Sequence, residues 1–193
     1  MALLKTEDKI SPEEYLQGEL KSDIRHEYVD GRVYAMTGAS VNHNRITGNL
    51  ARLFGNHLNG KDCETFTSDM KLKVNNEYRY PDIMVVCDNN FLDNGYSTQS
   101  PVLIVEVLSK STRKTDTTEK VFSYLNIPTL LEYVLIEQDI VSVEVMSKSQ
   151  NWQSRRYYLG DQITFESISL SLSVEEIYER VENEDMQEYL YSE

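Results

Sequence analysis

The sequence predicts one α/β domain in which helices flank a mixed β-sheet and additional antiparallel strands extend it. Three observations favour this class: a nearly all-apolar segment of strand length at 102–108, helical periodicity before and after it, and short alternating segments toward the C-terminus. The chain has 193 residues, 40% of them hydrophobic and 26% charged, as is typical of a single globular unit. We therefore expect one domain over 1–193, with an acidic C-terminal tail from about 182.

The N-terminal part predicts a short helix, a hairpin and a longer helix. Ser11-Pro12-Glu13-Glu14 combines an N-cap serine, a proline at the first helical position and a glutamate three residues after the cap, so a helix should run to about Leu20. Asp30-Gly31 between β-forming residues indicates a tight hairpin. Apolar residues recur with helical spacing over about 42–58, and Asn59-Gly60 should end that helix.

The middle of the chain predicts three strands. Segment 64–74 alternates as a strand does, and 80–87 should return as a second strand before a long polar loop over 88–100. Segment 102–108 is almost continuously apolar and β-branched, so we expect a central strand that is covered on both faces.

After the central strand, the sequence predicts a helix and a series of short strands. Ser109 to Thr112 should cap a helix that runs to about Asn126. Further strands are expected at 131–137, 141–146, 152–158 and 163–165. Ser173 should cap a last helix.

Two features bear on the location of the protein. No apolar run approaches the roughly 20 residues that a membrane-spanning helix needs, and the first residues lack the hydrophobic stretch of a signal peptide, so we expect a cytoplasmic protein without membrane association. Cys63 and Cys87 are 24 positions apart, without a CxxC motif or paired histidines. We therefore expect two ordinary buried thiols rather than a zinc site or a disulfide.

The formal net charge of −13 argues against binding of nucleic acid by bulk electrostatic attraction. Residues 174–193 contain eight acidic side chains against Arg180, so this tail carries −7 and the other 173 residues carry −6. The body of the protein is only mildly acidic. The tail itself is typical of a solvated helix face or a frayed terminus.

The most informative residue is Glu106, because it interrupts the apolar central strand. A carboxylate buried there costs several kcal/mol unless it is paired, hydrogen-bonded or bound to a metal. Asp82 begins another apolar strand segment, and two carboxylates on neighbouring strands suit Mg²⁺. The alternative for either acid is a buried salt bridge or a surface acid at a strand end.

Asp116, Lys120 and Tyr124 follow on the predicted helix at intervals of four residues and should share one stripe. From there the lysine could reach Glu106, as its counter-charge, as a phosphate contact or as the group that orients an attacking water. The spacing fits equally well an exposed Asp116–Lys120 pair that contributes only a few tenths of a kcal/mol.

The order of these motifs resembles the PD-(D/E)XK superfamily of Mg²⁺-dependent, restriction-endonuclease-like nucleases, and within it a bacterial branch of Uma-type endonucleases. That branch shows a Glu-aromatic-x-Asp-Gly hairpin, a His before a helix, Pro-Asp, a Glu-Val-Leu-Ser strand and Asp-x-x-x-Lys-x-x-x-Tyr. The matching segments are Glu27-Tyr28-Val29-Asp30-Gly31, His43, Pro81-Asp82, Glu106-Val107-Leu108-Ser109, and Asp116 through Lys120 to Tyr124. They span roughly residues 11 to 180; each is short, and their order and spacing carry the resemblance.

The resemblance implies a restriction-endonuclease-like core and metal-dependent hydrolysis of DNA phosphodiester bonds. Asp82 and Glu106, helped by Glu27 and the backbone carbonyl of Val107, would hold Mg²⁺, for which Mn²⁺ can substitute. A bound metal of this kind lowers the pKa of a water and stabilises charge on the scissile phosphate.

One residue departs from the superfamily pattern. The usual lysine, two places after the strand acid, falls at Leu108, which can neither bind phosphate nor polarise water. The resemblance suggests that Lys120 takes over this role. His43, Asp116 and Tyr124 are expected as accessory residues of the same site.

The substrate implied by the resemblance is DNA, with a homodimer left open as the assembly. Because the overall charge is unfavourable, contacts to DNA should come from local basic residues. The candidates are Arg45, Arg52, Lys110, Arg113 and Lys114. The competing hypothesis is a catalytically inactive, nuclease-like fold that serves as a nucleic-acid or protein interaction module.

Overall fold

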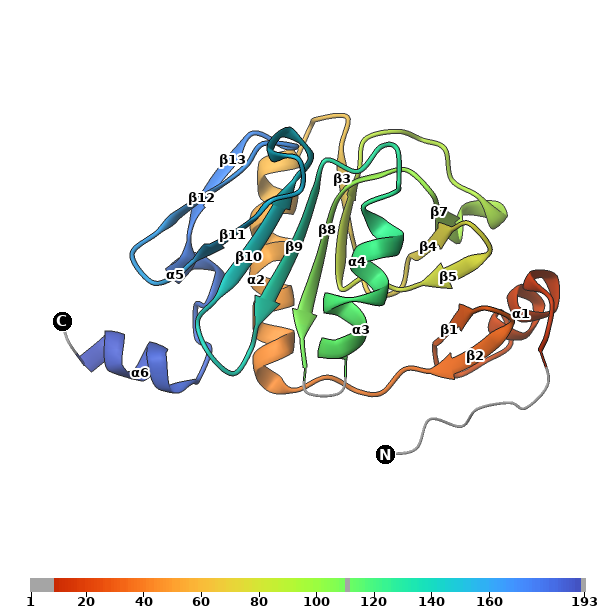
Figure 1. Cartoon of the computed structure of the whole chain (residues 1–193), viewed down its shortest axis with the longest axis horizontal. Helices are drawn as coiled ribbons and strands as arrows, with labels where there is room; N and C mark the ends of the chain where they lie inside the picture. The colour runs from red at the N-terminus through yellow and green to blue at the C-terminus, as the bar shows by residue number, and fades with distance from the viewer. Residues whose placement is uncertain (1–8, 110–111, 192–193) are drawn as a thin grey trace.

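The computed structural model describes residues 9–109 and 112–191 (Figure 1). In chain order the strands are β1 (His26–Val29), β2 (Arg32–Ala35), β3 (Glu64–Thr67), β4 (Lys71–Val74), β5 (Glu77–Arg79), β6 (Ile83–Val86), β7 (Ser97–Thr98), β8 (Pro101–Leu108), β9 (Glu132–Glu137), β10 (Val143–Ser147), β11 (Ser154–Tyr157), β12 (Gln162–Phe165) and β13 (Leu170–Ser173). The helices are α1 (Pro12–Glu19), α2 (Val41–Leu58), α3 (Arg113–Thr117), α4 (Glu119–Tyr124), α5 (Val174–Ile177) and α6 (Glu184–Tyr191), with 3₁₀ turns η1 (Asp93–Gly95) and η2 (Lys148–Gln150).

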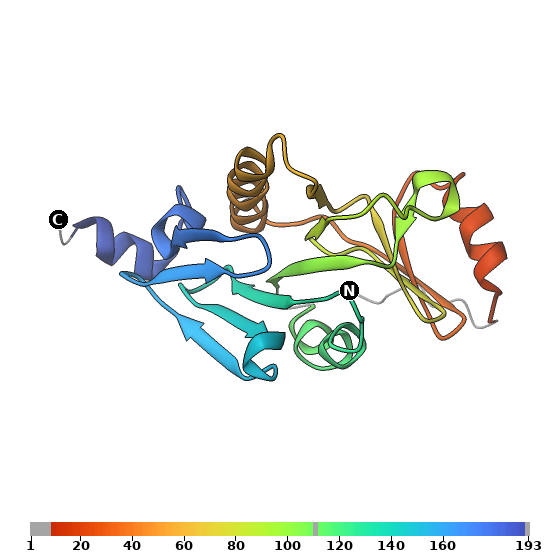
Figure 2. The same cartoon turned by 90° about the horizontal axis from the view of Figure 1, so that it is seen from above.

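Two sheets organise the chain. The larger has the strand order β11-β10-β9-β8-β6-β3, the smaller has β2-β1-β5-β4-β7, and β12 and β13 form a separate two-stranded ribbon. In the larger sheet β8 runs parallel to β9 and antiparallel to β6, so the sheet is mixed. In Figure 2, α2 lies on one side of this sheet, and α3 and α4 lie on the other. The predicted α/β class with a mixed sheet, flanking helices and added antiparallel strands is confirmed.

The central strand β8 is buried on both faces, as its composition predicts. Val105 and Val107 pack in the core that contains α2, whereas Ile104 and Leu108 pack in the core that contains Tyr124 of α4. Because successive side chains of a strand point to opposite faces, both faces need apolar residues. Glu106 belongs to the Ile104 and Leu108 face, so it points toward α3 and α4.

Several local predictions are confirmed. Ser11 and Glu14 form a capping box at the start of α1. Asp30 and Gly31 both have positive φ, 51° and 82°, as the tight turn between β1 and β2 requires. The amphipathic helix expected at 42–58 is α2, and Ser40 caps it by accepting the His43 N–H.

The strand expected at 64–74 is wrong as a single element, because it is two strands, β3 and β4, which lie in different sheets. The strand expected at 80–87 is found as the shorter β6, and β5, which precedes it in the other sheet, lies outside the expected strands. At the break between β3 and β4, Ser68 adopts a φ of 34° and its N–H donates to the Asp82 carbonyl at 3.2 Å. Apolar and polar residues still alternate through the break at Ser68, so hydrophobic periodicity alone does not show that the chain changes sheets there.

The helix expected at 109–126 is shorter and broken. Thr118, between α3 and α4, has φ −129° and ψ −74°, and the Thr117 hydroxyl donates to the Arg113 carbonyl at 2.7 Å. Threonine hydroxyls compete for backbone acceptors, which favours such a break. The polar loop at 88–100 contains η1 and β7, and β13 lies outside the strands that the sequence predicts.

The expectation of two buried free thiols is wrong, because Cys63 and Cys87 form a disulfide. They flank β3 and β6, whose last paired residues are Glu64 and Val86, so strand pairing brings them face to face. Both are half-buried. The sequence separation of 24 does not reveal this pairing.

Over the ranges described above, no helix is long and apolar enough to cross a membrane.

Candidate active site

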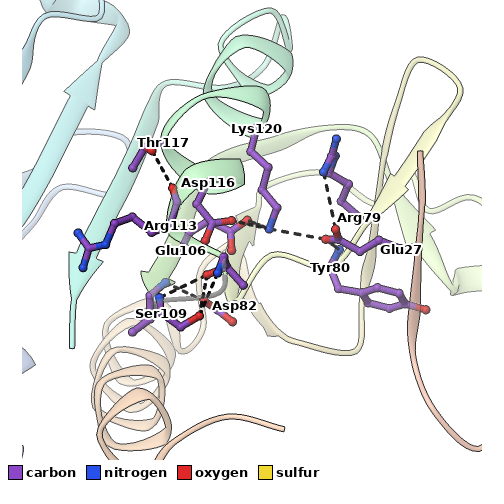
Figure 3. A network of polar contacts seen from close by, with 12 residues as sticks. Glu27, Arg79, Tyr80, Asp82, Glu106, Ser109, Arg113, Asp116, Thr117 and Lys120 are labelled. Atoms are coloured by element: carbon purple, nitrogen blue, oxygen red, sulfur yellow. Dashed lines mark hydrogen bonds and ion pairs between the residues drawn. The ribbon is translucent and has the colours of Figure 1, made fainter. Parts of the chain in front are cut away.

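Asp82 and Glu106 lie side by side where β6 and β8 pair. The register places Ile83 opposite Val105, so Asp82, one residue earlier, lies opposite Glu106. Opposed residues of an antiparallel pair project from the same face of the sheet. Asp82 Oδ2 also accepts the backbone N–H of Val107 at 2.7 Å. The two strands therefore bring together the two acids that the sequence singled out (Figure 3).

Lys120 reaches Glu106 from α4, and both Lys120 and Asp116 are buried, so the alternative of an exposed Asp116–Lys120 pair is wrong. Its Nζ lies 2.9 Å from Glu106 Oε1, 3.0 Å from Asp116 Oδ1 and 3.6 Å from Glu27 Oε1. The hydroxyl of Tyr124 donates to the same oxygen of Glu106 at 3.3 Å. One buried ammonium thus faces three carboxylates from three different elements.

Burial and neighbouring charges perturb the titration of this cluster. Burial raises the pKa of Glu106 well above its ordinary value; Lys120 opposes this rise, and Asp116 and Asp82 add to it. For Lys120, burial alone would lower the pKa, but the surrounding anions, Glu106 first, hold it well above its ordinary value. Lys120 is therefore charged at neutral pH. Burial also raises the pKa of Tyr124, which remains a neutral hydrogen-bond donor.

The cluster holds more negative than positive charge. Four carboxylates, those of Glu27, Asp82, Glu106 and Asp116, face Lys120 or one another, and the second nearby cation, Arg79, is shared with Glu77. Such an excess of buried negative charge is unfavourable unless a further cation or protons offset it.

A magnesium ion fits this donor set. Mg²⁺ prefers one or two carboxylates and keeps several waters, and Asp82, Glu106 and the Val107 carbonyl offer oxygen donors of that kind. Within the described ranges, no group of three or more acidic, histidine or cysteine side chains forms a ready-made metal cage. The site suits a partly hydrated ion rather than a fully caged one.

His43 supports Asp82. It lies in the first turn of α2, and its Nε2 is 3.1 Å from Asp82 Oδ2. Its Nδ1 is buried and has no hydrogen-bond partner in the part of the chain that the structure describes. His43 is therefore placed to orient Asp82.

Arg79 is a member of the site that the sequence reasoning missed. Its side chain is only 3% exposed, and it contacts Glu77 and Glu27 from β5, two residues before Pro81. A signal was present in the sequence: an arginine stands between Tyr78 and Tyr80 in a β-forming segment. The same argument that singled out Glu106 applies to this buried charge.

The basic residues expected to contact DNA do not gather at the acidic cluster as free cations. Arg45 pairs with Glu182 and Arg52 pairs with Glu179, both at 2.9 Å, and Arg113 pairs with Glu137. Glu179 and Glu182, both in the acidic segment 174–193, thus neutralise two arginines of α2. Lys114 is exposed and makes no ion pair with another described residue, and Lys110 lies outside the described residues.

Comparison with known families bears out the resemblance. A family model, Uma2, described as "Putative restriction endonuclease", matches residues 12–175. The chain belongs to this family. Two Synechocystis proteins described as "Uncharacterized protein slr1290" and "Uncharacterized protein sll1609" are similar to it. The first is 40% identical over 174 residues, covering 88% of this chain and 92% of the relative; the second is 38% identical over 152 residues, covering 77% and 86%.

A solved structure shares the Uma2 fold seen here. It is the crystal structure of "a putative nuclease belonging to DUF820" from Anabaena variabilis, which superposes with a TM-score of 0.73. The similarity covers 88% of this chain and 97% of the other at 18% sequence identity. At this identity the match establishes the fold, and it agrees with a restriction-endonuclease-like architecture for this Uma2 protein.

Proposed function

We propose that this Uma2 protein is a Mg²⁺-dependent endonuclease that hydrolyses DNA phosphodiester bonds, with Mn²⁺ able to replace Mg²⁺. The observation that carries the proposal is the buried Glu106, opposed by Asp82 and approached by Lys120. A purely structural ion pair would balance its charges, whereas this cluster has an excess of carboxylates. A divalent cation would offset most of that excess.

Each residue of the cluster has a role in the proposal. Asp82, Glu106 and the Val107 carbonyl would hold the metal, and His43 would orient Asp82. When bound, the metal ion lowers the pKa of a water and stabilises charge on the phosphate. Lys120 keeps its proton, so it serves as an electrostatic donor to the developing charge and not as a base.

Accessory residues keep this arrangement in place. Tyr124 donates to Glu106, and Asp116 holds the Lys120 ammonium from within α3.

DNA contact relies on Lys114 and Lys110, and on the arginines of α2 when a phosphate competes with the acids that pair with them. Because these contacts are few, affinity should be low and fall steeply with salt. A cytoplasmic location and a homodimer belong to the same proposal.

The test is cleavage of supercoiled plasmid and of labelled oligonucleotides with Mg²⁺, with Mn²⁺ and with EDTA. The wild type should nick or linearise DNA only with metal, and Glu106→Gln should abolish this. Glu144→Gln is a matched control, because Glu144 is also a strand acid that pairs with an arginine, but it lies on β10 away from the cluster. RNA oligonucleotides run in parallel test the choice of DNA.

The competing interaction module predicts a different outcome. With Leu108 in place of the usual lysine, an inactive protein would show no cleavage and no thermal stabilisation by Mg²⁺ or Mn²⁺, since a satisfied ion-pair network binds no metal. Both results together would overturn the nuclease proposal.

A further inference from the structure

Arg79 is a buried arginine whose ion pairs go to Glu77 and Glu27 and not to Asp82 or Glu106, the carboxylates assigned to the metal in the proposed function. Its Nε and Nη2 donate to Glu77 Oε2 at 3.1 and 2.9 Å, and its Nη1 lies 3.7 Å from Glu27 Oε2. The arginine therefore joins a carboxylate on its own strand to one on β1. Arginine suits this position, because its planar fork holds two acids in fixed directions.

Glu27 lies between two buried cations. Tyr28 pairs with Tyr78 in the β1–β5 register, which places Glu27 opposite Arg79. One carboxylate oxygen faces Arg79; the other accepts the Tyr80 N–H at 3.3 Å and lies 3.6 Å from Lys120 Nζ. Both oxygens are therefore engaged with protein groups. Figure 3 shows Lys120 between Glu27 on one side and Glu106 on the other.

This arrangement does not suit Glu27 as a metal ligand. A Mg²⁺ ligand oxygen lies about 2.0–2.1 Å from the ion, and Lys120 occupies the space between Glu27 and Glu106. It does suit Glu27 as the third carboxylate paired with the Lys120 ammonium. The ammonium donates a hydrogen bond to Glu106, and the carboxylates of Asp116 and Glu27 form ion pairs with it from two other directions.

We propose that Arg79 and Glu27 form a positioning pair: Arg79 fixes the carboxylate of Glu27, which in turn fixes the ammonium of Lys120, and Glu27 does not bind metal. This inference rests on the proposed function for its catalytic consequence. Its structural part is that the position of the Lys120 ammonium depends on both Arg79 and Glu27, and this can be tested without any cleavage activity.

The kinetic test uses Arg79→Met, Arg79→Lys, Glu27→Gln and the double variant of Arg79→Met with Glu27→Gln. Arg79→Met and Glu27→Gln should each lower kcat about tenfold or more, while the Kd for Mn²⁺ changes by no more than about threefold. The double variant should be no worse than the poorer single variant, because both act through Lys120. Arg79→Lys should recover part of the loss.

Arg156→Met is the matched control, since Arg156 also pairs with a strand acid, Glu144, but lies exposed on β11. It should leave both kcat and metal affinity unchanged. A loss of Mn²⁺ affinity of about tenfold or more in Glu27→Gln would tie Glu27 to metal binding and overturn the inference. Additive losses in the double variant, or unaltered turnover in Arg79→Met, would do the same.

A second measurement does not depend on cleavage. The ¹⁵Nζ resonance of Lys120, assigned by its absence from Lys120→Arg, should shift in the same direction in Glu27→Gln and in Arg79→Met, and stay in place in Arg156→Met. If Arg79→Met fails to fold, the Lys120 resonance is compared instead in Arg79→Lys and Glu27→Gln against Arg156→Met. An unmoved Lys120 resonance refutes the positioning pair even if the wild type cleaves DNA, and a moved one supports it even if no cleavage is found.

Discussion

Removing the charge of Glu106 and removing that of Lys120 should affect stability very differently. Lys120 faces three carboxylates, so Glu106→Gln still leaves Asp116 and Glu27 as its partners, and the glutamine carbonyl can replace the lost acceptor. Lys120→Met instead leaves those carboxylates facing one another without their shared cation. Breaking a buried pair in this way costs about 3–5 kcal/mol, whereas we expect Glu106→Gln to change the free energy of unfolding by about 1 kcal/mol or less.

Both variants can be compared by thermal unfolding at neutral pH, with and without Mg²⁺. For a chain of this length, 1 kcal/mol corresponds to about 2–4 °C, so Lys120→Met should lower Tm by roughly 6–20 °C. Metal at 100 times its Kd should stabilise the wild type by about 2.7 kcal/mol and should not stabilise Glu106→Gln. Glu144→Gln serves as the control. Equal destabilisation by Glu106→Gln and Lys120→Met, with no gain from metal, would show a closed structural ion pair and refute the argument from excess charge.

Three further predictions concern the disulfide, pH and the acidic tail. Reducing the Cys63–Cys87 bridge, which closes a loop of about 25 residues, should lower the free energy of unfolding by about 3–4 kcal/mol, as measured by urea unfolding with and without dithiothreitol. The folded pKa of Glu106 lies above its unfolded value, so the free energy of unfolding of the metal-free protein should fall as pH rises from the unfolded pKa to the folded pKa. Over the same range the affinity for Mn²⁺ should rise, because the metal binds the ionised carboxylate. Glu106→Gln should flatten the pH dependence of both the stability and the Mn²⁺ affinity. Glu182→Gln should free Arg45 and raise DNA affinity modestly at low salt in fluorescence anisotropy, and no gain would argue against α2 as a DNA contact.

The sequence predicted the elements whose signals are local. The capping box at Ser11, the Asp30-Gly31 turn and the amphipathic helix α2 each depend on a few neighbouring residues, and each is found. The burial of both faces of β8 could also be predicted, because an almost continuous apolar segment is typical of a central strand. The spacing of Asp116 and Lys120 fitted an inward lysine and an exposed pair equally well, and the structure shows the inward lysine although the helix is broken at Thr118 between them.

What the sequence did not show depends on long-range pairing. The break at Ser68 changes sheets without interrupting alternation, and the Cys63–Cys87 bridge exists because β3 pairs with β6. Arg79 belongs to the cluster because β5 pairs with β1, which sets it opposite Glu27. Register of this kind follows from tertiary packing, and local composition carries little of it.

The departure at Leu108 has a physical explanation in this packing. Leu108 shares the face of β8 on which Glu106 lies, but it is 3% exposed and packs in the same apolar core as Tyr124. A lysine there would place a charge in that core. Lys120 approaches the same face from α4, where the carboxylates of Asp116 and Glu27 also pair with its charge. A cation delivered from α4 can therefore reach Glu106 while the end of β8 remains apolar, and this makes the motif's missing lysine compatible with a catalytic cluster.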